Sequence, residues 1–401
     1  MKKCIYFVLL ISLVIACNKK NKIDTKIDDK FYYIEDFRKP GMDDYQTIVA
    51  AQDSLPENSK IMFSAKTYVF SHTPIIQKSL FFYGPAILKR EDQITYTLKE
   101  PADESSTKLI LNNTEGLISA DRILVGLNET NAGTTVTNVA IEVRGDTVIL
   151  NTPLGKTVDN RGVYPAGTKL FKSINFFWVV SATKYPDISC SFNNLTFDGN
   201  RDNNKGSYSW LLNAAVVAVS KGTTKYRDCK FMNSPGETIV GHNADIRNCT
   251  FYNLNGSGFH TSADKQNCPE NEIHSYLAGN TFENTNQINT TIGGHSEGAI
   301  THSNSGGYYT ATGNTFINVG ESVLGALYPS NSINDWGTSN ILFTGNKIDG
   351  ADRMVYLIDT SAGIIHDVKI EKNTISNLNG HDFSKELKIW PGIVLKNKSG
   401  K

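Results

Sequence analysis

The apolar and polar positions from residue 192 onward follow a repeat that is centred on one large apolar residue. Each unit, such as "IRNCTFYN" (246–253), has a second apolar residue five positions before this pivot and an Asn or Gly two positions after it. A variable period of this kind is typical of a solenoid whose extra residues enter loops. The pivots lie 20 to 34 residues apart at Phe197, Phe231, Phe251, Phe282, Phe316, Ile348 and Ile375.

Short runs between the pivots, such as "AAVVAVS", "ETIVGH" and "EGAITHS", are too short and too rich in β-branched residues for helices. Several short strands per repeat predict an all-β fold, a right-handed parallel β-helix. Its rungs would stack about 4.8 Å apart, so equivalent residues would form ladders along the axis. One predicted ladder of side-chain amides lies two positions before the pivots and consists of Asn280, Asn314, Asn346 and Asn373.

The segment 41–70, "GMDDYQTIVAAQDSLPENSKIMFSAKTYVF", pairs a short amphipathic helix with an apolar strand. A β-helix has an apolar end with unpaired strand edges, and a short helix can cover it. The order of Gly, paired Asp, Gln, paired Ala, Leu-Pro and an aromatic strand resembles the opening of the pectate-lyase-like superfamily. The resemblance implies a parallel β-helix and a role in polysaccharide cleavage.

The N-terminus predicts export, because two lysines precede an apolar run from Ile5 to Ile15. The run is shorter than the roughly 20 residues that span a bilayer, which disfavours a transmembrane anchor. Its ending, Val-Ile-Ala-Cys, resembles a bacterial lipobox and implies lipidation of Cys17. We therefore expect a monomer held by lipid at the outer membrane of a Gram-negative cell envelope, on the periplasmic or the surface side.

The same patterns predict the order of the segments along the chain. Residues 118–158 alternate apolar and polar positions around turn signals, which indicates a separate small β unit, and "ELKIWPGIVLK" would close the far end. The expected segments are a signal peptide (1–17), a polar tether (18–31), a cap with the first rungs (32–101), a β insertion (102–170), and the remaining rungs with a C-terminal cap (171–401).

Charge and cysteine content narrow the partners. Forty Lys and Arg balance forty Asp and Glu, so no global field attracts nucleic acid. Cys229 and Cys249 share an inward column on adjacent rungs, where a disulfide is possible and two buried thiols are the preferred interpretation.

The segment "DGNRDNN" (198–204) offers oxygen ligands for calcium without the spacing of an EF-hand loop. We otherwise expect no cofactor.

Candidate chemistry lies on the outer wall, because the interior of such a solenoid is packed. The residue five positions before each pivot faces inward, and side chains alternate along a strand. Arg227 and Arg247 directly follow such residues, so they face outward on adjacent rungs, with Lys230 nearby. Two stacked arginines suit a carboxylate or sulfate, although a solvated charged face is an equal alternative. If Ile239 and Phe259 face inward, the histidines His242 and His260 face outward, with Lys265 further along.

This set of side chains suits proton abstraction next to a uronate carboxylate. Arg227 and Arg247 would neutralise the carboxylate, His260 or His242 would act as base or acid, and Lys265 would be a reserve base. "SPGETIVG" (234–241) is similar to a Gly-Glu-x-Ile segment of β-helix lyases that act on alginate and dermatan. If water leaves instead of sugar, the enzyme would be a uronyl-oligosaccharide dehydratase.

Further polar and aromatic residues are candidates for substrate contacts, and aromatic side chains can stack on sugar rings or only cover a loop. Besides Lys230, these candidates are Tyr208, Trp210, Glu297, His302 and Tyr308. His302 is the one that alternation turns inward. Two other functions stay open, namely a glycoside hydrolase acting on an acidic polysaccharide and a noncatalytic glycan-binding β-helix lipoprotein. The hydrolase needs two carboxylates about 5 to 9.5 Å apart, whereas the candidate acidic residues are scattered along the sequence.

Overall fold

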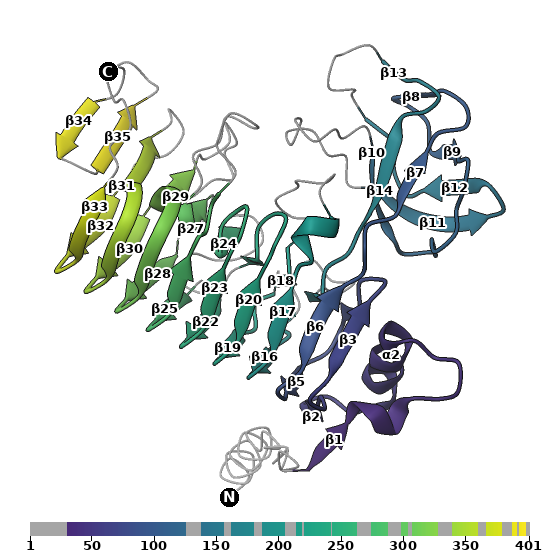
Figure 1. Ribbon diagram of the computed structural model, residues 1–401, viewed down its shortest axis with the longest axis horizontal. Coiled ribbons are helices and arrows are strands. Elements are labelled where there is room, and N and C mark those ends of the chain that lie inside the picture. The colour runs from purple at the N-terminus through teal and green to yellow at the C-terminus, as the bar shows by residue number, and fades with distance from the viewer. Residues whose placement is uncertain are drawn as a thin grey trace, which may run out of the picture. The chain divides into compact units, whose positions relative to one another are not determined.

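Three walls of parallel strands coil around one apolar core (Figure 1). The computed structural model describes residues 30–125, 138–155, 162–179, 187–204, 214–218, 220–241, 243–262, 274–287, 298–303, 307–327, 339–359, 366–378, 387–390 and 393–397. None of their helices is long and apolar enough to cross a membrane. The predicted signal peptide, Cys17 and nearly all of the tether lie outside the described residues.

Wall A is a sheet of ten parallel strands. Its strands, in order, are β1 (Phe31–Tyr33), β2 (Ser59–Met62), β5 (Leu80–Tyr83), β16 (Cys190–Asn193), β19 (Thr224–Arg227), β22 (Ala244–Arg247), β25 (His274–Ala278), β28 (Tyr308–Thr312), β30 (Ser339–Thr344) and β32 (His366–Glu371).

Walls B and C are joined through two long strands, β29 (Thr315–Leu327) and β31 (Lys347–Asp359), whose first halves lie in wall B and second halves in wall C. The other strands of wall B are β3 (Thr67–Phe70), β6 (Ile87–Arg90), β17 (Thr196–Asp198), β20 (Lys230–Met232), β23 (Thr250–Tyr252), β26 (Thr281–Glu283) and β33 (Thr374–Leu378). Those of wall C are β4 (Ile75–Ile76), β15 (Phe177–Val179), β18 (Val216–Ala218), β21 (Ile239–Gly241), β24 (Phe259–Ser262), β27 (Gly298–Ser303) and β35 (Ile393–Asn397). β34 (Leu387–Trp390) pairs antiparallel with β35. The predicted parallel β-helix is confirmed.

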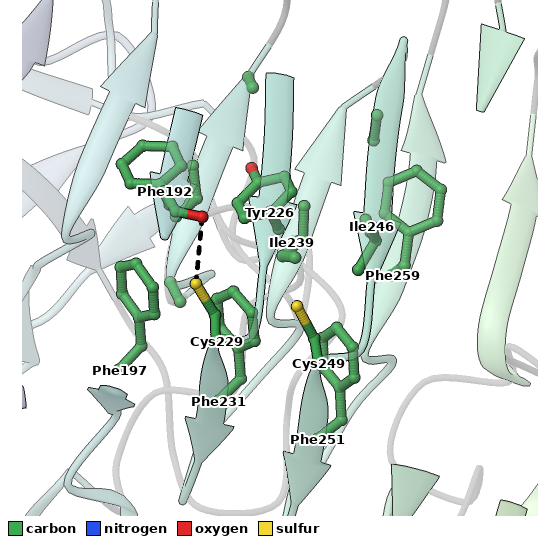
Figure 2. Packing of buried hydrophobic residues seen from close by; sticks show 14 of the residues in the cluster. Phe192, Phe197, Tyr226, Cys229, Phe231, Ile239, Ile246, Cys249, Phe251 and Phe259 are labelled. Atoms are coloured by element: carbon green, nitrogen blue, oxygen red, sulfur yellow. Dashed lines mark hydrogen bonds between the residues drawn. The ribbon is translucent and has the colours of Figure 1, made fainter. Parts of the chain in front are cut away.

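The pivot residues lie in register along wall B, as the repeat predicts. From Phe197 to Phe316 their rings stack at centroid distances of 4.7, 5.0, 4.5 and 4.9 Å. Figure 2 shows three of these rings beside the inward residues of the other walls. The column ends at the last rung, where Ile375 is 39% exposed.

The predicted amide ladder occupies the corner between walls A and B. The backbone N–H of Asn280 and its side-chain amide both donate to Oδ1 of Asn314, each at 2.9 Å. Asn314 repeats these two bonds to Asn346, and Asn346 repeats them to Asn373. Because Asn280, Asn314 and Asn346 are fully buried or nearly so, the ladder satisfies amides that have no access to water.

The two inward cysteines of the repeat are free thiols, which agrees with the preferred interpretation (Figure 2). The thiol of Cys229 lies 3.3 Å from the carbonyl oxygen of Phe192 on the preceding rung. Burial raises the pKa of Cys249 well above its usual range, so this thiol is not a nucleophile at neutral pH.

The N-terminal helix covers the first rungs. After the short helix η1 (Ile34–Phe37), α2 (Asp44–Ser54) begins with a capping box, in which the backbone N–H of Gln46 donates to Asp43 at 2.7 Å. Ile48 and Ala51 of α2 are completely buried in the main core. The helix therefore caps the solenoid as predicted.

The β insertion is an antiparallel unit with its own apolar core. It extends from residue 95 to residue 173, slightly wider than the predicted 102–170. Its strands are β7 (Thr95–Thr97), β8 (Ala102–Asp103), β9 (Lys108–Ile110), β10 (Arg122–Val125), β11 (Asn138–Arg144), β12 (Thr147–Leu150), β13 (Val163–Tyr164) and β14 (Lys169–Ser173). Since it follows β6 of wall B and precedes β15 of wall C, it enters at the corner between these walls.

Candidate functional site

The two predicted arginines lie side by side on the outer face of wall A. Arg227 of β19 pairs in register with Arg247 of β22, which confirms the predicted outward column. Asp245 lies between them and binds both: its carboxylate accepts from Nε of Arg247 at 2.8 Å and from Nη2 of Arg227. The chain itself thus supplies one carboxylate to the two arginines, and their predicted role toward a substrate carboxylate stays a prediction.

Electrostatics around Asp245 agree with this assignment. Burial opposes ionisation of Asp245, but hydrogen bonds from Arg247 and Arg227 outweigh it, so its pKa lies below the ordinary value. Sequence alternation could have found this partner, because Asp245 stands two positions before Arg247 on the same face of the strand.

Other predicted substrate contacts lie on different walls. Tyr308 on wall A is 50% exposed, and its ring stacks on His274 at a centroid distance of 5.0 Å. Lys230 lies on wall B, with its ammonium 5.7 Å from the ring centre of Tyr252. These side chains belong to separate faces and form no single site with His260 on wall C.

His302 faces the interior. Its Nδ1 lies 3.2 Å from the hydroxyl of Thr261, and its ring lies 5.2 Å from that of Tyr309, a residue of the main core. The prediction that His302 contacts substrate is therefore wrong, because this side chain faces inward, as alternation in β27 suggests. The remaining candidates, His242, Lys265, Tyr208, Trp210 and Glu297, lie outside the described residues.

His260 lies on the outer side of wall C. Its neighbour Phe259 packs in the main core, as Figure 2 shows, and successive residues of a strand face opposite sides. Its rung partner Val240 packs with Ala214 and Val217 in a small cluster outside the main core. The predicted outward direction of His260 is confirmed, although its side chain is only 3% exposed.

A buried carboxylate contacts His260. Oε1 of Glu237, from the corner between β20 and β21, makes a short hydrogen bond with Nδ1 of His260. The Glu237 side chain has no solvent exposure, and its Oε2 has no hydrogen-bond partner. Burial raises the pKa of Glu237 well above its ordinary range. The site thus holds one acidic group and one imidazole in direct contact, away from water.

The surrounding corner is tightly packed. The hydroxyls of Ser257 and Thr301 lie 2.7 Å apart, and Thr301 is the rung partner of His260. A Cβ at Gly256 would lie 3.0 Å from the backbone nitrogen of Glu237, so a glycine lets the two corner segments approach. This packing places Glu237 directly against His260.

The sequence reasoning did not connect Glu237 with His260. Glu237 precedes its strand, so alternation does not say where its side chain points, and 23 residues separate it from His260. The one available signal was the Gly-Glu-x-Ile segment itself.

The segment 198–204 binds other parts of the chain. It contains the short helix η2 (Arg201–Asn203), and the side-chain amide of Asn200 donates to the carbonyl of Arg90 at 3.0 Å and to Asp92 at 2.8 Å. Within the described residues, no group of three His, Cys, Asp or Glu side chains is placed to hold a metal ion.

Comparisons with known proteins give distant similarities. No protein-family model matches this sequence, and no curated protein is significantly similar to it. Among solved structures, the chain is similar at 12% identity to a glycoside hydrolase, with a TM-score of 0.37 over 84% of this chain and 89% of that one. It is also similar at 12% identity to PfbA, a surface adhesin of Streptococcus pneumoniae, with a TM-score of 0.44 over 91% and 81%. A family 28 exopolygalacturonase of Yersinia enterocolitica matches at 12% identity, with a TM-score of 0.35 over 92% and 78%.

Proposed function

We propose that the protein is a carbohydrate-active lyase that cleaves a uronate-containing glycan by β-elimination at the outer face of wall C. The observation that carries the proposal is the buried contact between Glu237 and His260. A carboxyl group that binds Nδ1 of a histidine fixes the ring and its tautomer, which prepares Nε2 for proton transfer.

The raised pKa of Glu237 assigns the two roles. A neutral Glu237 accepts the Nδ1–H of a neutral imidazole at Oε1 and retains a proton on Oε2. Because the Glu237 side chain is completely buried, its role is to orient the ring of His260 and not to contact the sugar. Nε2 of His260 then removes the C5 proton, the electron pair forms the C4–C5 double bond, and the C4–O bond breaks. The departing oxygen takes up the proton that His260 removed, so the neutral imidazole is regenerated and no water is consumed.

This assignment changes the roles expected for the arginines. Arg227 and Arg247 lie on wall A, where both bind the carboxylate of Asp245, so neither serves a uronate at His260 on wall C. Hydrolysis would need two carboxylates about 5 to 9.5 Å apart. The pair that the structure brings together is instead a carboxyl group and an imidazole, which favours elimination over hydrolysis.

Product absorbance tests the reaction. Purified protein is incubated with polygalacturonate, alginate and a dermatan-type glycan, and the ultraviolet absorbance of the new conjugated double bond is followed. We expect His260→Gln to lower kcat at least about 100-fold, as loss of an acid–base group does, and Glu237→Ala to lower kcat by removing the acceptor that orients the ring. His274→Gln removes an exposed histidine of wall A and should leave the rate unchanged.

Other results would contradict the proposal. Reducing ends without ultraviolet absorbance would identify a hydrolase, and binding without either product would identify a glycan-binding protein. Full activity of a folded His260→Gln variant would exclude this site.

A further inference from the structure

Arg122 and Trp178 meet where the insertion joins the solenoid. Arg122 begins β10 of the insertion and Trp178 is the middle residue of β15 in wall C. The guanidinium carbon lies 3.3 Å from the ring centroid of Trp178, so the two planes are in van der Waals contact. Both side chains are partly exposed.

The other charged groups of this junction have partners of opposite charge. Nζ of Lys172 lies 2.6 Å from Glu91, and Nδ1 of His72 lies 2.8 Å from Asp121. Within the described residues, no carboxylate pairs with Arg122. Burial lowers the pKa of Arg122 to about 10, which leaves it charged at neutral pH. A partly buried guanidinium on an aromatic ring retains its hydrogen-bond donors for an anion.

Register places this pair on the wall that carries His260. Trp178 faces outward, because Phe177 and Val179 on either side of it belong to the main core. Its rung partners in succession are Val217, Val240 and His260. Three rung steps separate Trp178 from His260, a distance of about 14 Å along the axis.

The insertion and Glu237 also share one edge of the solenoid. The insertion begins at the corner between walls B and C. Glu237 occupies the same corner in a later coil, where it lies between β20 and β21. Arg122 and the corner that holds Glu237 and His260 therefore lie on the same side of the solenoid.

We propose that Arg122 and Trp178 form a remote subsite for an acidic glycan, in which Arg122 binds a uronate carboxylate and Trp178 packs against a sugar ring. This inference rests on the proposed function for its substrate class. The guanidinium fork matches a carboxylate with two parallel hydrogen bonds, and the indole ring offers an apolar face.

Binding to full-length protein carrying His260→Gln tests the subsite without turnover. Calorimetry with oligogalacturonates and oligomannuronates of increasing length, at two salt concentrations, compares Arg122→Gln with the parent. We expect about tenfold weaker binding of long acidic oligomers, a smaller salt dependence, and no change for oligomers too short to span both places. Trp178→Leu should weaken the binding of the same long oligomers.

Arg144→Gln is the matched control, because Arg144 lies on the same insertion with its side chain 85% exposed. It should bind all oligomers as the parent does. Dextran sulfate and a neutral glucan distinguish the anion: binding of sulfate chains alone would overturn the carboxylate assignment, and equal binding of neutral chains would overturn the anion site.

Thermal melts separate binding from a structural role. A lower melting temperature of Arg122→Gln with unchanged affinity would mean that the cation–π contact only attaches the insertion, and the inference would be wrong. If the wild-type protein makes no unsaturated product but Arg122→Gln still weakens the binding of acidic oligomers selectively, the subsite stands and the proposed reaction fails.

Discussion

At the residue scale, the chemistry of wall C depends on how one proton is shared between two buried groups. Glu237 is shielded from water and keeps its proton to a higher pH than a free glutamate, because burial disfavours its charged form. The unfolded chain has no such restraint. The contact with His260 therefore couples the charge state of the site to folding.

Replacing Glu237 with Gln should change how stability depends on pH. In the wild type the folded state holds a proton that the unfolded state has lost above the ordinary pKa of 4.5. The free energy of unfolding of the wild type should therefore fall relative to Glu237→Gln as pH rises above 4.5, by up to about 1.4 kcal/mol per pH unit. Urea denaturation of both proteins between pH 4 and 8 measures this difference. A difference that stays constant with pH would mean that Glu237 is ionised in the folded protein.

Prediction from sequence succeeds at this scale where side chains alternate along a strand. The outward positions of Arg227, Arg247 and His260 follow from the inward residues next to them. Alternation cannot orient Glu237, which lies at a corner before its strand begins. Alternation also places Asp245 on the same face as Arg247, but it does not show that Asp245 reaches Arg227 on the neighbouring strand.

At the scale of elements, the rungs are fixed by interactions that repeat between equivalent corners. Asn314 is the centre of the buried amide ladder, since it accepts from Asn280 and donates to the carbonyl of Leu277 at 3.1 Å and to Asn346 at 3.0 Å. The spacing of asparagines before the pivots was sufficient to predict this ladder, because a two-residue corner leaves little choice of position.

Asn314→Ala should destabilise the protein by about 3 kcal/mol, because it removes several hydrogen bonds and leaves the backbone N–H of Asn280 buried without a partner. Urea denaturation measures the loss. Thr312→Ala, on the outer face of the same rung, is the control and should change stability by no more than about 0.5 kcal/mol. Equal effects of the two substitutions would show that the ladder contributes nothing specific.

At the scale of the whole molecule, the residues of the predicted site lie on different walls of the solenoid. The repeat predicts that Arg227, Arg247 and His260 lie on neighbouring rungs, which is correct along the axis, but it does not assign them to walls. Arg247 ends a strand of wall A, whereas His260 lies in a strand of wall C. The wall to which a strand belongs depends on how sharply the chain turns at each corner. The corners differ in length, so the sequence repeat does not give this angle.

Attachment to a membrane is also a property of the whole chain. Its forty basic and forty acidic residues balance, so net charge gives little attraction to anionic lipid, and the predicted attachment depends on lipid chains. The lipobox-like Val14-Ile15-Ala16-Cys17 predicts that Cys17 carries them. Cells fed an alkyne-tagged fatty acid should label the wild-type protein and the Cys4→Ser variant equally, because Cys4 is removed with the signal, whereas Cys17→Ser should lose the label. Labelling that persists in Cys17→Ser, or that is missing from the wild type, would contradict lipidation of Cys17.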